Sequence, residues 1–248
     1  MAIVTRTFTW RPDIPDFRDY TYTPSTSAQI QSMVDLRNQM SPVEDQGKVG
    51  SCTGCAVAGA LEFLQRKATG TYTDISRLFL YYNGRAAIGT QSYDSGATLR
   101  DVVKSAAKLG ACSESIWPYM IGKYTRVPTS AAYADAAKNK VTEYMRIETL
   151  DGVRQCLSEG FPVVFGFTAY SAFMSPAVTA SGVLDMPGRL EKAIGGHAAV
   201  IVGYSDASKR VLVRNSWGPK WGDNGYFTMP YDYVSNRSLS DDFWTIRK

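Results

Sequence analysis

The ten residues Gln46–Cys55 restrict the fold more than any other stretch of the chain. They read Gln-Gly-Lys-Val-Gly-Ser-Cys-Thr-Gly-Cys, so a glycine-rich loop runs directly into Cys52. Apolar residues then recur at helical spacing, which predicts a helix that begins near Cys52 and ends at Gly70. Unpaired N–H groups and the positive end of the helix dipole favour an anion at such a position. For a cysteine that anion is the thiolate, the nucleophilic form.

A nucleophile of this kind needs a base, and the chain contains one histidine, His197. Two glycines precede it, and an apolar run that ends at Tyr204 follows it. A third polar side chain, Asn215, opens the segment Asn-Ser-Trp-Gly. The sequence therefore offers a thiol, an imidazole and an amide that can orient the imidazole, the three parts of a nucleophilic triad.

These three stretches together resemble the papain-like cysteine proteases. The family's Gln-Gly-x-x-Gly-Ser-Cys is matched by Gln46–Cys52, and its His-Ala followed by an apolar strand is matched by His197–Tyr204. Its Asn-Ser-Trp-Gly-x-x-Trp-Gly-x-x-Gly-Tyr is matched throughout Asn215–Tyr226. The likeness covers about residues 34–248 and is that of a bacterial-type member with an atypical N-terminal arm.

The resemblance implies a catalytic role for each matched residue. Cys52 as a thiolate would attack the peptide carbonyl, and His197 as the imidazolium would protonate the leaving amine. Asn215 would fix the orientation of the His197 ring. Gln46 and the backbone N–H of Cys52 would hold the oxyanion. Since the chain has no second histidine for an occluding loop, we expect an endopeptidase rather than an exopeptidase.

The resemblance also implies a set of substrate-binding residues. The family binds an extended peptide against a glycine-containing loop, for which Gly96 is the candidate. Gly166 and Ala198 occupy positions that line the second subsite, and their small side chains predict a roomy pocket for a bulky apolar or aromatic side chain. Trp217 would shield the histidine and asparagine from water. The expected partner is a peptide or protein substrate.

The fold class implied by the resemblance is α+β, with a helical half facing an antiparallel β half across the active-site cleft. The sequence pattern agrees with it: residues 34–142 are mainly helical and include Cys52, whereas residues 143–248 are mainly strands and include His197 and Asn215. A chain of 248 residues with 44% apolar and 20% charged residues is long enough for two such halves.

Residues 1–33 precede the part that matches the family. The segment is rich in proline and aromatic residues, which argues against a long helix. One interpretation is an ordered arm that packs on the body of the protein through its aromatic side chains. The alternative hypothesis is that the arm covers the cleft and inhibits the enzyme.

Two other functional classes compete with a protease. Cys52 and Cys55 form a Cys-x-x-Cys, which allows a thiol-disulfide oxidoreductase, although no strand of the expected βαβ unit precedes it. A catalytically latent papain-like binding protein is the other alternative. A zinc site is poorly supported because the thiols are scattered. Cys112 and Cys156 are interpreted as buried hydrophobic residues, and their pairing stays open.

Charge and hydropathy limit the remaining partners. The net charge of +4 comes without a run of basic residues, so nucleic-acid binding is not required. No apolar stretch reaches the length of a membrane span, and no cofactor or metal is expected. Since the N-terminus lacks the apolar segment of a signal peptide, we expect a cytoplasmic protein, or a secreted one if a signal has been removed.

Overall fold

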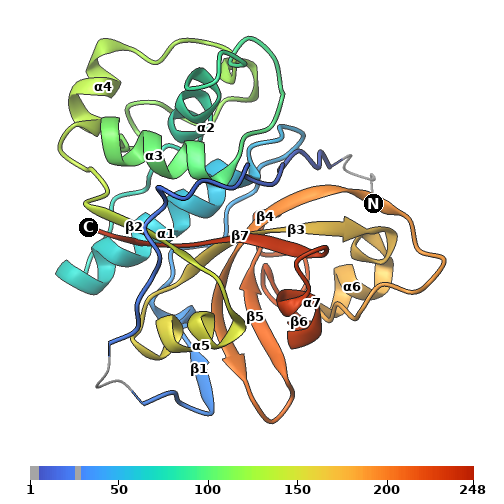
Figure 1. Ribbon diagram of the computed structural model, residues 1–248. Coiled ribbons are helices and arrows are strands. Elements are labelled where there is room, and N and C mark those ends of the chain that lie inside the picture. Colours follow the sequence, from blue (N-terminus) through green and yellow to red (C-terminus); the bar gives the residue numbers. More distant parts are fainter. Residues whose placement is uncertain (1–5, 26–28) are drawn as a thin grey trace.

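The computed structural model describes residues 6–25 and 29–248 (Figure 1). Its helices are, in chain order, α1 (Cys52–Thr69), α2 (Arg77–Ala86), α3 (Leu99–Leu109), α4 (Ser130–Ala136), α5 (Leu150–Ser158), α6 (Pro176–Ser181) and α7 (Tyr231–Ser235). Short 3₁₀ turns lie at Arg37–Gln39, Ile121–Lys123 and Ser171–Met174. The strands are β1 (Met33–Asp35), β2 (Glu143–Ile147), β3 (Val163–Tyr170), β4 (Ala193–Ser205), β5 (Arg210–Arg214), β6 (Tyr226–Pro230) and β7 (Ser240–Arg247).

The strands form one antiparallel sheet in the order β2-β7-β3-β4-β5-β6, with β1 also paired to β4. Strand β4 lies at its centre and pairs with β3 on one side and β5 on the other. Both β3 and β4 read as apolar runs and are buried over most of their length, as the sequence predicts. The α+β class is therefore confirmed. The division at residues 142 and 143 stays a prediction, since β1 joins the sheet from the N-terminal side.

Local sequence signals set the ends of the main helices. Helix α1 begins at Cys52 and ends at Thr69, and it is capped by Gly70, whose φ of 78° places it in the left-handed region that favours glycine. Helix α3 begins after Thr98, whose hydroxyl accepts a hydrogen bond from the backbone N–H of Asp101. The alanine-rich stretch 129–140 is helical only in α4, because a turn follows Ala136.

Helix α1 joins the two halves of the molecule. All its residues from Cys52 to Leu64 are buried, and the helix packs against α2 on one side and β4 on the other. Glycines allow this close approach: a Cβ on Gly54 would lie 2.6 Å from the carbonyl oxygen of Arg77 in α2. A helix buried on all sides holds its N-terminal cysteine in a fixed place between the helices and the sheet.

The described part of the N-terminal arm, residues 6–25 and 29–33, begins between the two halves. In Figure 1 its dark blue part runs across the molecule, with α2 and α3 on one side and the strands of the sheet on the other. The described part is extended with one turn near Arg18, so the expectation that it forms no long helix is confirmed. It then bonds to β2, where the backbone N–H of Tyr22 donates to the carbonyl of Arg146 (2.8 Å).

Within the two described ranges, none of the helices combines the length and the apolar character needed to cross a lipid bilayer.

Candidate active site

Cys52 lies at the first residue of α1, at the end of the glycine-rich loop. The preceding residue, Ser51, does not cap the helix with its side chain, because its hydroxyl instead pairs with that of Tyr119 at 2.6 Å. The backbone N–H groups of Cys52 and Thr53 therefore stay free to face the sulfur, and both act to lower the pKa of the Cys52 thiol. The backbone of Ala198, in β4, also bonds to the sulfur.

His197 directly precedes Ala198 in β4, so it is the strand neighbour of the residue whose backbone bonds to the Cys52 sulfur. The Nε2 atom of His197 lies 2.8 Å from Oδ1 of Asn215. That oxygen also accepts the backbone N–H of Ser216 at 2.8 Å, which identifies it as the amide oxygen. Nε2 must then carry the proton, and the neutral ring presents a bare Nδ1, which has no hydrogen-bond partner among the described residues.

Aromatic rings enclose the imidazole. The ring centroid of Trp217 lies 5.2 Å from that of His197, and the rings of Phe167 and Phe173 lie within 5.8 Å of it. The fourth neighbour, Phe8, belongs to the arm and meets His197 edge to face at 6.0 Å. These contacts leave His197 fully buried.

Gln46 is held in the loop before Cys52 by several hydrogen bonds. Its side-chain oxygen accepts the hydroxyl of Ser216 (2.6 Å), its amide nitrogen donates to the carbonyl of Val49 (3.0 Å), and its backbone carbonyl accepts the hydroxyl of Tyr119 (2.7 Å). Since an amide nitrogen carries two hydrogens, one remains for another acceptor. The sequence motif thus has a structural reason, because Gln46 and Ser216 connect the loop before α1 to the segment after β5.

Burial reverses the ionisation expected from the helix terminus. It raises the pKa of the Cys52 thiol to about 11, although the nearby backbone N–H groups act in the opposite direction. It lowers the pKa of His197 to about 4, and the positive charge of Arg6 adds to this effect. With the arm in place the pair is therefore a neutral thiol and a neutral imidazole, whereas the sequence led us to expect a thiolate.

Glycines make room for the arm beside Cys52 and His197. A Cβ on Gly96 would lie 1.9 Å from the carbonyl oxygen of Thr9, and one on Gly166 would lie 1.9 Å from the indole ring of Trp10. Real side-chain contacts are never that close, so only glycine is compatible with the arm at these points. The arm is held by its backbone as well, since the N–H of Trp10 donates to the carbonyl of Gly196 at 3.0 Å.

We call the space that the arm fills beside Gly96 and Gly166 the glycine channel. The candidate substrate-binding residues lie around it. Gly96 and Gly166 contact the arm, and Trp217 contacts it through Arg6, whose guanidinium carbon lies 5.2 Å from the ring centroid. Ala198 pairs with Gly166 across β3 and β4 and bonds to the Cys52 sulfur through its backbone.

Sequence reasoning missed two glycines of the channel, Gly50 and Gly195. They contact Thr9 and Phe8 of the arm. Both belong to the motifs around the cysteine and the histidine, but nothing in a single sequence marks their missing side chains as space for another segment.

The other three thiols are bonded neither to Cys52 nor to one another. All four cysteines are among the described residues, and all are free and buried. Cys55 faces Ser51, with its sulfur 4.0 Å from that hydroxyl, and Cys156 contacts the hydroxyl of Thr245 at 3.2 Å. Neither the Cys52–Cys55 pair nor the Cys112–Cys156 pair forms a disulfide here.

One group of carboxylates has a spacing that could hold a metal ion. Oxygens of Glu44, Glu62 and Asp74 lie within 4.8 Å of one another. Glu44 is already paired with Arg77, and the carboxylate of Glu62 accepts the backbone N–H of Ile75. Burial also raises the pKa of Glu62 to about 7, so we assign no metal to this group.

Comparison with known proteins identifies close relatives of this arrangement. Residues 30–242 match the family described as Papain family cysteine protease. The chain is 41% identical to an uncharacterized peptidase C1-like protein of Acanthamoeba polyphaga mimivirus, over 88% of this chain and 73% of that protein. It is 27% identical to mouse (Mus musculus) cathepsin K over 86% of this chain, and it spans 65% of that protein's length.

Among solved structures, xylellain, a cysteine protease from Xylella fastidiosa, is similar over the whole fold. The TM-score is 0.91 at 39% identity, and the match covers 97% of this chain and 96% of xylellain. The likeness therefore includes the N-terminal part of the chain, which lies before the family match.

Proposed function

The chain belongs to the papain family of cysteine proteases, and from this premise we propose that it hydrolyses peptide bonds with Cys52 as nucleophile and His197 as base. The observation that carries the assignment is the bond between Nε2 of His197 and Oδ1 of Asn215, at 2.8 Å. Because Asn215 accepts the N–H of Nε2, it leaves Nδ1 as the basic atom of the ring.

In the proposed mechanism, Nδ1 takes the thiol proton of Cys52 and the sulfur attacks the scissile carbonyl. The oxyanion that forms is stabilised by the backbone N–H of Cys52 and the remaining N–H of Gln46. His197 then gives the proton to the leaving amine, which leaves an acyl-enzyme. In the second half, His197 removes a proton from water, and the resulting attack releases the acid and restores the thiol.

We propose that substrates occupy the channel that the arm fills here. The carbonyl of Gly196 accepts a backbone N–H in the present structure, and the glycine walls accept extended chain without side-chain clashes. The space beside Gly166 and Ala198 holds the indole of Trp10, which is only 5% exposed. This occupancy supports a preference for substrates with a large aromatic side chain at that subsite.

The same contacts support autoinhibition by the arm. Phe8 covers His197, Thr9 donates a hydrogen bond to the carbonyl of Gly50 (2.8 Å), and the side chain of Arg6 pairs with Asp45 (2.5 Å). A substrate cannot reach Cys52 while these residues stay in place, and the neutral thiol is a poor nucleophile. In our proposal the chain as it stands is therefore latent and becomes active when the arm leaves.

The test needs an enzyme whose arm can be released. Phe17 is 98% exposed at the arm's turn, so a recognition sequence for a site-specific protease can be inserted after it and cut once the protein has folded. We call the product, which retains every residue of the chain, the nicked enzyme. It should hydrolyse aromatic peptides and react with the epoxide inhibitor E-64, whereas the uncut chain should do neither at a comparable rate.

Two substitutions in the nicked enzyme separate the candidate functions. Cys52→Ala should abolish hydrolysis and E-64 labelling, whereas Cys55→Ala should retain both, because Cys55 faces Ser51 and not His197. Turnover that survives Cys52→Ala would exclude Cys52 as the nucleophile. Loss of activity with Cys55→Ala in a folded protein would favour the oxidoreductase instead.

A further inference from the structure

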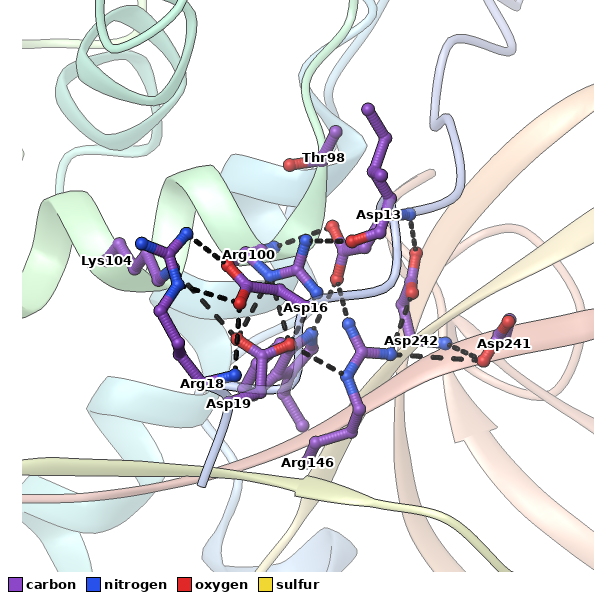
Figure 2. Close-up of polar contacts among 12 residues, drawn as sticks. Asp13, Asp16, Arg18, Asp19, Thr98, Arg100, Lys104, Arg146, Asp241 and Asp242 are labelled. Carbon is purple, nitrogen blue, oxygen red and sulfur yellow. Dashed lines mark hydrogen bonds and ion pairs between the residues drawn. The ribbon is translucent and has the colours of Figure 1, made fainter. Parts of the chain in front are cut away.

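A buried charge cluster ties the arm to the body of the protein, beyond the pocket that holds Trp10. Figure 2 shows Asp13 and Asp19 of the arm directed toward Arg100 of α3 and Arg146 of β2, with Asp242 of β7 beside them. The carboxylates of Asp13, Asp19 and Asp242 are each at most 4% exposed. Such complete burial makes the interactions strong and specific, because little solvent screens them.

Asp13 occupies a site with three converging donors. Its carboxylate accepts Nη2 of Arg146 (2.7 Å), Nε1 of Trp244 (3.0 Å) and the backbone N–H of Arg100 (3.2 Å). The last donor belongs to the first turn of α3, so the positive end of that helix also faces the carboxylate. We call these three donors the carboxylate pocket.

The body of the protein supplies no substitute for the arm at this place. Within the described residues, every hydrogen bond of the Arg100 side chain goes to the arm, to the carboxylate of Asp19 and the carbonyl of Ile14. Arg146 keeps one close partner from the body, Asp242, at 3.0 Å. When the part of the arm before Phe17 leaves, the three donors lose Asp13 as their acceptor, and the charged guanidinium of Arg146 among them favours a new anionic ligand.

We propose that the carboxylate pocket is a substrate subsite, which binds an aspartate or glutamate side chain when the arm is displaced. This inference rests on the proposed function and specifies its substrates further. Trp10 and Asp13 are three residues apart in the extended arm. The preferred substrate therefore carries an acidic side chain about three positions from the aromatic side chain that fills the Trp10 pocket.

The arm shows what the subsite selects. A carboxylate accepts all three donors at once, whereas an amide of the same shape offers a single oxygen and places an N–H among donors. A charge-assisted hydrogen bond is roughly twice as strong as a neutral one, so we expect discrimination of roughly tenfold or more between Asp and Asn.

The first experiment uses pairs of fluorogenic peptides as substrates of the nicked enzyme. The two peptides of a pair, which we call twins, differ at one residue. Each peptide carries one tryptophan, and the residue three positions before or after it is Asp in one twin and Asn in the other. The Asp twin should have a kcat/KM at least tenfold higher in one of the two directions. Equal values in both directions, with both twins hydrolysed, would overturn the subsite while leaving the protease assignment intact.

Substitutions assign the preference to the pocket. Arg146→Gln should bring the ratio of the two kcat/KM values, Asp twin over Asn twin, toward one. Because both values are measured with the same variant, a partial loss of folded protein does not change their ratio. The matched control is Arg154→Gln, since that guanidinium pairs with Asp151 and Asp206, away from the arm. An unchanged ratio with Arg146→Gln would show that another site recognises the acidic side chain.

A binding measurement decides the question independently of catalysis. The nicked protein with Cys52→Ala, separated from its own cut N-terminal fragment, is titrated with a synthetic peptide of residues 6–17 and with the same peptide carrying Asp13→Asn. The substituted peptide should bind at least tenfold more weakly, and equal affinities would overturn the carboxylate pocket even if the enzyme proves inactive. A failure of the proposed function appears elsewhere, as absent E-64 labelling of the nicked wild-type enzyme.

Discussion

At the scale of single residues, the site is governed by competition between the helix terminus and burial. The first turn of α1 and its free N–H groups favour a thiolate at Cys52, yet the thiol and His197 are both fully buried when the arm is closed. The cost of placing two charges in a water-free site exceeds what a helix dipole supplies. In the proposed autoinhibition, the arm therefore blocks access to Cys52 and also removes the ionised form of the pair.

This interpretation predicts the titration of His197, which NMR can follow without assignment because the chain has one histidine. In the uncut chain its pKa is about 4. In the nicked enzyme it should rise by roughly two or more units, since water and the Cys52 thiolate then stabilise the imidazolium. Arm closure would therefore release a proton from His197 between the two pKa values, so acidification across that interval weakens closure through this group.

The control for this titration is nicked Cys52→Ala, in which the His197 pKa should fall below that of the nicked parent because the anionic partner is gone. Identical pKa values before and after cutting would contradict the role of the arm in ionisation.

A second prediction concerns Glu62, whose buried carboxyl has a pKa raised from its ordinary 4.5 to about 7. The folded state binds the proton more tightly than the unfolded state. Stability from this group is therefore complete below pH 4.5 and is lost as the pH rises to 7, by roughly 3 kcal/mol. In Glu62→Gln, which keeps the shape of the protonated carboxyl, urea denaturation at pH 5 and pH 7.5 should give a smaller difference than in the parent.

The exposed carboxylate of Asp185, paired with Arg210 on the surface, offers the matched control. Asp185→Asn should leave the pH dependence of stability as it is. A Glu62→Gln protein with the parent's full pH dependence would assign the effect to other groups.

At the scale of secondary structure, helix α1 connects catalysis to the fold. It begins at Cys52, packs against α2 through Gly54 and against β4 on its other side, so its position sets the distance between sulfur and imidazole. Strands β3 and β4 contribute the other wall, with Gly166 and Ala198 paired across them. The site is thus rigid on both sides, and the movable part is the arm.

Gly54→Ala tests the role of this close packing. The added Cβ would lie 2.6 Å from the carbonyl oxygen of Arg77, a backbone atom that cannot turn away. We expect a loss of about 1–3 kcal/mol in the free energy of unfolding, measured by urea denaturation, and a lower kcat in the nicked enzyme. The control is Gly122→Ala, whose Cβ would meet no described heavy atom within 4 Å. Equal stability of the two variants would show that α1 and α2 separate easily.

At the scale of the whole molecule, the arm is a third component placed between the helical half and the sheet. Along its length the arm contacts first the glycine channel, then the walls of the pocket that holds Trp10, and then Arg100 and Arg146 of the charge cluster. Since these contacts lie on both halves, the closed arm also joins the halves. Displacing it has to break several separate contacts, which explains how a segment without regular structure stays ordered.

The strongest single contact of the arm is predicted to be Trp10. Trp10→Ala in the uncut chain should increase the rate of E-64 labelling roughly 100-fold, because the loss of a buried indole costs several kcal/mol of closure. Trp10→Phe should remain nearly as slow as the parent, since the indole N–H of Trp10 has no hydrogen-bond partner among the described residues. Labelling at the parent's rate in the Ala variant, with an unchanged Tm, would mean that the arm is held elsewhere.

The sequence by itself determined the candidate residues for catalysis and the elements that contain them. Cys52 at a helix start, the single His197 in an apolar strand and Asn215 after it were visible because local spacing dictates helix and strand. The α+β class was implied by the resemblance to the papain-like proteases, and the change of pattern near residue 143 agreed with it. The catalytic roles themselves remain predictions that the experiments above address.

Only the tertiary structure decided which contacts the arm makes with that site. The seating of Trp10 beside Gly166, the neutral form of Cys52 and His197, and the meeting of Asp13 with Arg146 all join segments more than 100 residues apart in the sequence. No local pattern encodes such contacts, because the space left by a glycine and the burial of a charge depend on which distant segment occupies the neighbourhood.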